Sequence, residues 1–316
     1  MSSGEPPVHV EVLTPREVPL GGPRAMTVRR TLPQRQRSLI GAWCFVDHYG
    51  PDAVASTGGM LVPPHPHTGL QTVSWLFEGE VEHRDSTGAH AIVRPGEVNL
   101  MTAGNGVCHS EVSTPGTTTL HGVQLWVALP DHTRAMPASF ERHETVPLDL
   151  GGATVRVFLG SLVGAPSPVR VHSPIVGAEI VLAPGTELKL HVDPGFEHGL
   201  LVDSGRVSLA GAALERGDLG HVGTGVDRLT IADVGGEGAR LVLLGGAPFG
   251  EEIVMWWNFV GRSHDDIAAM REDWQAESAR FGRVEGYAGD PMRLSAPELP
   301  HLTLRPRSNA PTSNDR

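Results

Sequence analysis

The sequence predicts an all-β protein. Short segments rich in β-branched and large apolar side chains alternate with turn residues along most of the chain, which is typical of a sandwich or a closed barrel. The 316 residues include 39 Gly and 26 Pro, more breakers than a helix-rich chain usually carries. A second, fainter series of such segments follows the first, so the pattern indicates a duplicated fold in two domains.

The first series runs from about residue 26 to 129. Residues 72–77 alternate β-branched or small residues with large apolar ones, as in a strand with one buried face. Turn signals separate the next segments: Gly79 between two glutamates, the Pro95-Gly96 pair of a type II turn, and Asn105-Gly106, which favours positive φ. We therefore place a first β domain at residues 1–135.

The second series begins after an irregular stretch, which we assign as a linker over residues 136–150. A second β domain then spans residues 151–304, and the polar tail at 305–316 is predicted to be disordered. The strand segments expected in the second half are 153–159, 175–182, 187–192, 199–202, 207–209, 229–232 and 241–244.

One segment of the second half breaks the β pattern. Apolar residues recur there at helical spacing, at Ile267, Met270, Trp274 and Phe281. Ser263, followed three residues later by Asp266, resembles a capping box, and Gly282 stands where a helix stop is expected. These signals predict a short C-terminal helix over residues 264–281.

The composition argues against several classes of protein. A formal net charge of −11 does not suit a general nucleic-acid surface, which needs clustered Lys and Arg. Two cysteines, Cys44 and Cys108, without a CxxC motif, indicate a reducing compartment and no disulfide framework. No apolar run resembles a membrane span, and the start does not resemble a signal peptide. We expect a cytoplasmic protein with neither a nucleic acid nor a membrane as its partner.

Two short stretches carry the strongest chemical signal: His65 and His67 in Pro-His-Pro-His, and His109 and Glu111 in Cys-His-Ser-Glu. In an extended strand, side chains at i and i+2 point to the same face, so each pair can converge on one point. The separation of 42 residues from His67 to His109 fits about four short strands with turns, so a barrel can bring the pairs together. The expected site is a cage of three His and one Glu around one divalent metal.

The competing interpretation of these four residues is a set of interior polar groups satisfied by hydrogen bonds. Four such groups buried without partners would cost several kcal/mol, and a bound metal removes that cost most directly. Imidazole and carboxylate donors without a thiolate suit Fe(II), Mn, Ni, Co, Cu or Zn. Four ligands would close a zinc site, whereas an octahedral ion would keep two positions open for O₂ or for a chelating, anionic oxygen ligand. Cys108 should point away from the site and act as a packing residue.

Longer motifs surround the predicted ligands: Phe-Val-Asp-His-Tyr-Gly-Pro at 45–51, the paired histidines within 64–73, Leu-Phe-Glu-Gly-Glu-Val-Glu-His-Arg-Asp-Ser at 76–86, Arg-Pro-Gly-Glu at 94–97, and Met-Thr-Ala-Gly-Asn-Gly-Val-Cys-His-Ser-Glu at 101–111. With these motifs the chain resembles the pirin family, densely from about residue 25 to 130 and more weakly in the second half. The resemblance implies a bicupin, with two jelly-roll cupin β-barrels in one chain and a helix near the C-terminus. It also implies a metal in the N-terminal barrel, Fe(II) being favoured, and a second barrel without metal.

The ligands that this resemblance implies are the four residues already named, His65, His67, His109 and Glu111. One position departs from the family pattern, because many pirins carry Glu where this chain has Gln71. Since Glu111 already supplies a carboxylate, the metal should still bind. Gln71 is expected near the ligands, where the lost charge would affect substrate preference.

The resemblance further implies a quercetin 2,3-dioxygenase-type oxidoreductase. The metal would chelate a flavonol through its 3-hydroxyl and 4-oxo oxygens, Glu111 would take the 3-hydroxyl proton as the catalytic residue, and O₂ would attack the activated ring. The partners would then be O₂ and a small aromatic chelating substrate. Other pirins suggest an alternative, a non-catalytic redox- or metal-sensing regulator that binds a transcription factor or a metabolic enzyme. A metal-stabilised scaffold is a third possibility, and the fold alone does not choose among them.

Overall fold

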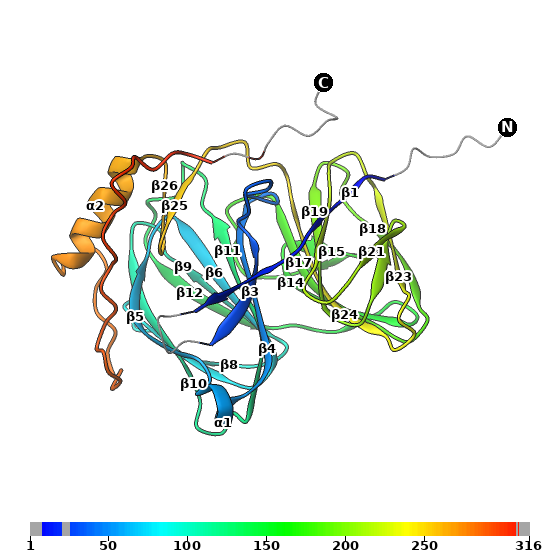
Figure 1. Ribbon diagram of the computed structural model, residues 1–316, viewed down its shortest axis with the longest axis horizontal. Helices are drawn as coiled ribbons and strands as arrows, with labels where there is room; N and C mark the ends of the chain where they lie inside the picture. The colour runs from blue at the N-terminus through cyan, green and yellow to red at the C-terminus, as the bar shows by residue number, and fades with distance from the viewer. Residues whose placement is uncertain (1–7, 21–25, 308, 310–316) are drawn as a thin grey trace.

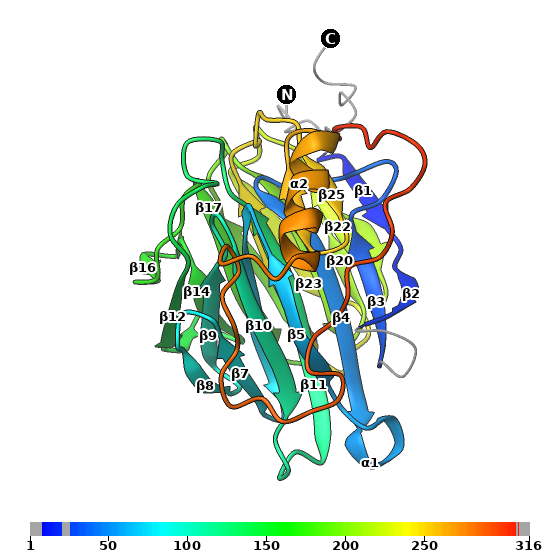
Figure 2. The same ribbon diagram turned by 90° about the vertical axis from the view of Figure 1, so that its left-hand side faces the viewer.

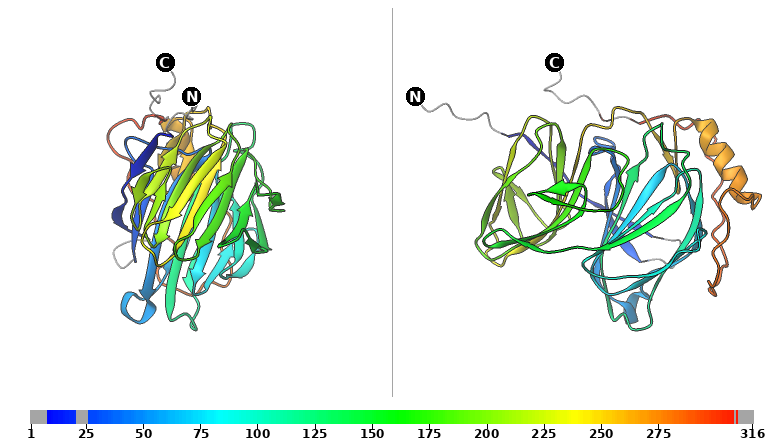
Figure 3. Two further views of the ribbon diagram at one scale, coloured as in Figure 1. Left: turned by 90° about the vertical axis from the view of Figure 1, so that its right-hand side faces the viewer. Right: turned by 180° about the vertical axis from the view of Figure 1, so that it is seen from behind.

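Two β-barrels lie side by side in the computed structural model, which describes residues 8–20, 26–307 and 309 (Figure 1). Helix α2 (His264–Gln275) packs on the outer side of the first barrel, away from the second, and the view from behind shows the same arrangement (Figure 3). The predicted fold class is confirmed: the chain is mostly β, with two barrels and a short C-terminal helix. Among the described residues, neither helix has the length and apolar character that a membrane crossing requires.

The first barrel consists of two antiparallel sheets that enclose an apolar core, as in a jelly roll. The larger sheet has seven strands, in the order β12 (Ser139–Glu144), β9 (Glu97–Thr102), β6 (Leu70–Glu78), β11 (Thr119–Ala128), β4 (Trp43–Ala53), β3 (Thr27–Leu32) and β2 (Arg16–Pro19). The smaller has four, in the order β5 (Leu61–His67), β10 (Val107–Ser113), β7 (Val81–Asp85) and β8 (His90–Val93). A single helical turn, α1 (Val54–Thr57), follows β4. Tyr49 and Leu76 of the larger sheet share a buried cluster with Val62 and Val81 of the smaller one.

The second barrel repeats this plan, as the duplicated pattern indicated. Its larger sheet has the order β1 (Val10–Leu13), β22 (Leu219–Val222), β19 (Glu197–Ser204), β24 (Ala239–Gly246), β17 (Ile175–Leu182), β14 (Ala153–Leu159) and β13 (Leu148–Asp149). Its smaller sheet has the order β18 (Glu187–His191), β23 (Arg228–Asp233), β20 (Val207–Leu209) and β21 (Ala212–Leu214). Two short ribbons complete the structure: β15 (Ser161–Leu162) with β16 (Ala165–Pro166), and β25 (Val254–Trp256) with β26 (Phe259–Gly261).

Strand pairing does not follow the boundaries expected at residues 135 and 151. β1 leaves the N-terminal half and pairs with β22 of the second barrel, with Val10 opposite Val222. The segment assigned as a linker over 136–150 contains β12, which pairs with β9, and β13, which pairs with β14. An alternating pattern identifies a strand, but the strand's partner depends on which sheet edge is open in the folded chain. The predicted tail at 305–316 lies mostly outside the described residues.

Helix α2 begins as predicted and ends early. Ser263 caps it by accepting a hydrogen bond from the Asp266 N–H, with 3.0 Å between the two atoms. The helix stops at Gln275, so the predicted extension to Phe281 is wrong. Phe281 nevertheless packs edge-on against Trp274 in the same apolar cluster, with 5.4 Å between the ring centroids. A loop after the helix brings Phe281 back against Trp274. Its position in the sequence therefore matches helical spacing although Phe281 is not in the helix.

An apolar layer joins the two barrels. Trp43 of the first barrel is fully buried, and its indole N–H donates to the carbonyls of Val176 and Gly245 in the second. Phe158 of the second barrel stacks on Trp75 of the first, with 4.9 Å between the ring centroids. Buried aromatic contacts of this kind fix the orientation of one barrel against the other.

The chain after the second barrel returns to the first. Figure 2 shows α2 and the segment that follows it lying over β5 and β10. Leu294 N–H donates to the carbonyl of Pro64 over 2.8 Å, and Val260 N–H donates to the carbonyl of Thr68 over 3.1 Å. The strand that carries His65 and His67 is therefore covered by residues far away in the sequence.

Candidate metal centre

Strands β5 and β10 bring three buried histidines together. His65 lies opposite His109 in the antiparallel register, with 4.3 Å between their ring centroids. The ring centroid of His67, two residues along β5, is 5.0 Å from that of His65 and 4.9 Å from that of His109. One nitrogen from each ring lies within 4.8 Å of the others. The i, i+2 spacing and the strand pairing therefore place these three predicted residues at one site.

Glu111 belongs to a second, overlapping group. Its carboxylate lies within 4.8 Å of ring nitrogens of His109 and His83. The register of the β10–β5 pairing shifts between His109 and Glu111, so an irregularity in the strand lies between these two residues. Ser74 Oγ and Gln124 Nε2 both donate to Glu111 Oε1, each over 3.3 Å. His109 is thus the residue that both groups share.

The protonation of the histidines suits metal binding. Burial lowers the pKa of His65 to about 4 and holds the pKa values of His67 and His109 well below the usual range, so the rings are neutral at pH 7. His65 Nδ1 lies 2.8 Å from the Pro63 carbonyl oxygen, and His67 Nδ1 lies 3.1 Å from that of Asn258. Because a carbonyl oxygen only accepts, both Nδ1 atoms carry the proton and both Nε2 atoms keep a lone pair.

His109 supplies the third lone pair. Its Nε2 is buried and has no hydrogen-bond partner among the described residues. A buried polar atom without a partner calls for an explanation, and a missing ion is one of the usual ones. Three neutral imidazoles with available Nε2 atoms, beside the carboxylate of Glu111, fit a divalent transition metal and would serve as its ligands.

Sequence reasoning missed two residues behind His109. His83 and Asp85 lie on β7, where the register sets Asp85 opposite His109 and His83 opposite Glu111. His83 Nε2 lies 3.1 Å from Asp85 Oδ2, and His83 Nδ1 lies 3.5 Å from His109 Nδ1. The carboxylate fixes the proton on His83 Nε2, so His83 Nδ1 accepts from His109 Nδ1–H and directs His109 Nε2 into the site. Their i, i+2 spacing in a predicted strand was the available signal.

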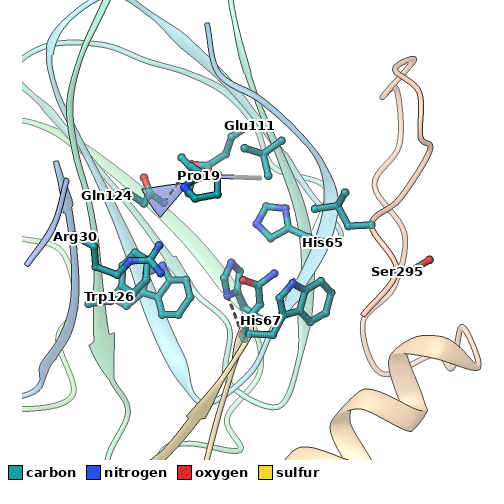
Figure 4. A pocket seen from close by; sticks show the side chains of 14 residues that line it. Pro19, Arg30, His65, His67, Glu111, Gln124, Trp126 and Ser295 are labelled. Carbon is teal, nitrogen blue, oxygen red and sulfur yellow. Dashed lines mark hydrogen bonds between the residues drawn. The ribbon is translucent and has the colours of Figure 1, made fainter. Parts of the chain in front are cut away.

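A cavity of about 450 Å³ opens onto His65, His67 and Glu111 (Figure 4). Its other lining residues are Pro19, Leu20, Arg30, Phe45, Val62, Gln124, Trp126, Trp257, Asn258, Leu294 and Ser295. This volume is within the range of small-molecule sites. The cavity is therefore large enough for an aromatic ligand next to the histidines.

One wall of this cavity is a column of stacked groups. The guanidinium carbon of Arg30 lies 4.3 Å from the ring centroid of Phe45, which stacks on Trp126 with 4.0 Å between centroids. Trp126 meets the ring of His67 edge-on at 5.1 Å. Asp47 fixes Arg30 with hydrogen bonds of 2.7 and 2.6 Å. The wall thus runs from a fixed cation, over two aromatic rings, to a histidine of the site.

Gln71 is buried on β6, and its side-chain hydrogen bonds go to residues outside the candidate site. Its Nε2 donates to Thr102 Oγ1 over 2.8 Å and to the Arg170 carbonyl over 3.2 Å, and its Oε1 has no partner among the described residues. The structure gives Gln71 no hydrogen bond to the predicted ligands. Its role near the metal stays a prediction.

Cys108 packs away from the histidines, as expected from its position between Val107 and His109. It joins an apolar cluster with Phe259, Ile267 and Met270 of the C-terminal segment. Burial raises the pKa of its thiol to about 12, so the thiol stays protonated and unreactive.

A third group of potential ligands lies between the barrels, where no sequence pattern predicts one. His48 Nε2 and His121 Nε2 of the first barrel share Oδ1 of Asp203 in the second, at 2.7 and 2.5 Å. Arg240 approaches the other carboxylate oxygen at 3.4 Å, and Arg29 Nε donates to His48 Nδ1. Because two imidazoles hydrogen-bond to one oxygen of a carboxylate that an arginine also pairs, this group is a buried ion network that links the barrels.

Two jelly-roll barrels in one chain, one of which holds a histidine-rich pocket, define a bicupin with a candidate metal site. A model of the Pirin family matches residues 25–127, and a model of the pirin C-terminal cupin domain matches residues 177–282. A "Pirin-like protein" of Caulobacter vibrioides is 37% identical over 79% of this chain and 88% of its own length. The chain belongs to the pirin family.

Two further relatives carry dioxygenase names. A Pseudomonas aeruginosa protein named "Putative quercetin 2,3-dioxygenase PA1205" is 45% identical, over 91% of this chain and 90% of its own length. The crystal structure of a quercetin 2,3-dioxygenase from Acinetobacter baumannii superposes with a TM-score of 0.88 at 38% identity, covering 95% of this chain and 98% of that one. Relatives of this chain therefore include proteins named for flavonol oxidation.

Proposed function

We propose that this pirin is a metal-dependent oxidoreductase of the quercetin 2,3-dioxygenase type. The observation that carries the proposal is the set of three neutral histidines, His65, His67 and His109, each with a ring nitrogen within 4.8 Å of the others, next to an aromatic-lined cavity that Glu111 also lines. The names of the Pseudomonas and Acinetobacter relatives support the same activity.

His65, His67 and His109 would hold the ion through Nε2, and Glu111 would hold it through its carboxylate. The donor set suits Fe(II), Mn, Ni, Co, Cu or Zn, and the resemblance to pirins favours Fe(II) among them. When bound, the ion would supply Lewis-acid and redox chemistry toward O₂ for a flavonol-like substrate able to chelate it.

Glu111 would take the proton of the flavonol 3-hydroxyl. Ser74 and Gln124 both donate to its Oε1, which leaves Oε2 free of these contacts. The substrate O–H bond would break as Oε2 gains the proton. Burial raises the pKa of Glu111, which makes its carboxylate a better proton acceptor than an exposed one.

The cavity wall would orient the substrate. Phe45 and Trp126 stack on each other and line the cavity with apolar ring atoms, and Arg30 offers a positive charge to a phenolate. Leu294 on the C-terminal segment adds apolar surface that excludes water. The proposal also keeps the protein in a reducing cytoplasm, where the buried thiols of Cys44 and Cys108 stay unpaired.

The test combines metal analysis of purified protein with oxygen uptake on a flavonol panel. We expect one divalent ion per chain and flavonol-dependent consumption of O₂. His109→Ala should lose both, whereas replacement of the exposed His132 by Ala should lose neither. Metal-free His109→Ala protein that still consumed O₂ with flavonols would contradict the assignment of the chemistry to this site. Fully loaded wild-type protein that consumed none would contradict the activity itself.

A further inference from the structure

The β25–β26 hairpin closes one side of the metal pocket. It comes from the chain that follows the second barrel, and Phe259 forms a bridge with Thr68, directly after His67. The carbonyl of Asn258 at the hairpin tip accepts from His67 Nδ1, the bond drawn as a dashed line in Figure 4. Trp257 and Asn258 both line the cavity. The tip of this hairpin therefore contacts a predicted ligand and also forms part of the ligand-binding surface.

The backbone conformation at the hairpin tip is unfavourable for the tryptophan at position 257. Trp256 pairs with Phe259, so the loop has two residues, Trp257 and Asn258. Trp257 has φ of 51°, and Asn258 is not among the residues with positive φ. Positive φ at the first loop residue alone is the arrangement of a type II′ turn, where glycine is the favoured residue. A bulky aromatic side chain in this conformation is strained, and such strain is often retained at functional sites.

Contacts with neighbouring aromatic rings cover only part of the Trp257 side chain. Its ring meets Phe259 edge-on, with 5.5 Å between centroids, and lies 6.3 Å from the ring of Trp256. The side chain stays half-buried, and it lines the same cavity as Phe45 and Trp126. Aromatic surface left open to a cavity can stack on a flat ligand.

We propose that Trp257 determines specificity, by stacking on the aromatic ring of a chelating ligand while the Asn258 carbonyl beside it orients His67. The inference rests on the proposed function and deepens it, because it assigns selection of aromatic over small ligands to one side chain. The strained turn is retained because it sets both groups at the pocket.

The test uses Trp257→Gly in the metal-loaded protein. Glycine suits the turn, so the hairpin and the Asn258 carbonyl should stay in place, and metal content and Tm should equal or exceed those of the wild type. We expect affinity for quercetin, followed by the absorption change of the chelated flavonol, to fall about tenfold. Affinity for azide, a small anionic ligand of the metal, should not change. Trp257→Phe should keep most of the quercetin affinity.

Ala210→Gly is the matched control. Ala210 has φ of 48° in the two-residue turn between β20 and β21 of the second barrel, far from the cavity. Ala210→Gly relieves the same kind of backbone strain and should leave the affinities for quercetin and azide unchanged. Equal quercetin affinity in Trp257→Gly and wild type, or an equal loss of quercetin and azide affinity, would overturn the inference alone. Wild-type protein that bound azide but no flavonol would overturn the proposed function and this inference with it.

Discussion

His48 Nε2 of the first barrel lies 2.7 Å from Oδ1 of Asp203 in the second. Burial alone would raise the pKa of Asp203, but its hydrogen bonds from His121 and His48 hold that pKa below the usual range. The carboxylate is therefore charged and fully buried at the junction of the barrels. Its hydrogen bonds with His48 and His121 join the second barrel to the first.

Asp203→Ala should destabilise the protein strongly. The change leaves two buried imidazoles and the guanidinium of Arg240 without their shared partner, and breaking a buried charged network in this way costs roughly 3–5 kcal/mol. Chemical denaturation followed by circular dichroism measures the loss. The exposed Glu187 of β18 gives a control, and Glu187→Ala should change stability little. A loss no larger than that of the control would show that the network contributes nothing to stability.

His198 should make the protein sensitive to acid. It is buried in the second barrel, neither ring nitrogen has a partner among the described residues, and burial lowers its pKa to about 4. The unfolded chain binds the proton near pH 6.5 and the folded chain does not, so stability falls as the pH drops from about 6.5 toward 4. The loss is roughly 1.4 kcal/mol per pH unit for one such group.

The measurement for His198 is urea unfolding between pH 7 and pH 4.5, with wild type and variants at the same metal content. His198→Leu should flatten the decline by about the slope of one group. His191→Leu, at an exposed position on β18, serves as the control. Parallel pH profiles for wild type and His198→Leu would mean that His198 binds its proton equally well in the folded and the unfolded chain, which would contradict the prediction.

His83→Gln should weaken metal binding without removing it. Loss of the imidazole frees His109 to turn, and loss of a residue that orients a ligand typically lowers metal affinity by about 10- to 100-fold. Competition with a chromophoric chelator gives the affinity. His90→Gln, at an exposed position on β8, should bind as wild type does. Unchanged metal affinity in His83→Gln would mean that His83 and Asp85 do not orient His109 for metal binding.

Glu111→Gln should lower kcat far more than it raises KM for a flavonol. The amide cannot take up the 3-hydroxyl proton, and loss of a general base typically lowers the rate by about 10²–10⁴-fold. Steady-state oxygen uptake on protein of measured metal content separates this effect from loss of the ion. A variant with wild-type kcat at full occupancy would assign the proton to another group.

The sequence sufficed for those parts of the site that depend on local geometry. Alternation within one strand sets His65 and His67 on the same face, and the length between the pairs allowed β10 to return beside β5. Hydrogen-bond partners that are far apart in the sequence could not be predicted from such local patterns. No local pattern connects His48 with Asp203, its hydrogen-bond partner 155 residues away.

The errors share a physical cause, which is contact between distant segments. Phe281 imitates a helical position because a loop returns it to Trp274. The hairpin that contacts His67 lies 191 residues away along the chain, so no spacing rule could connect Asn258 with that histidine. Strand pairing and loop return depend on the whole fold, whereas the alternating pattern depends on a few neighbours.

The placement of β1 constrains how the protein is made. On the ribosome, Val10 emerges roughly two hundred residues before Val222, its partner in the second barrel. This strand must wait without its partner until residues 219–222 have been made. A gene cut between the barrels should yield one fragment with a surplus strand and another with an open edge beside β22.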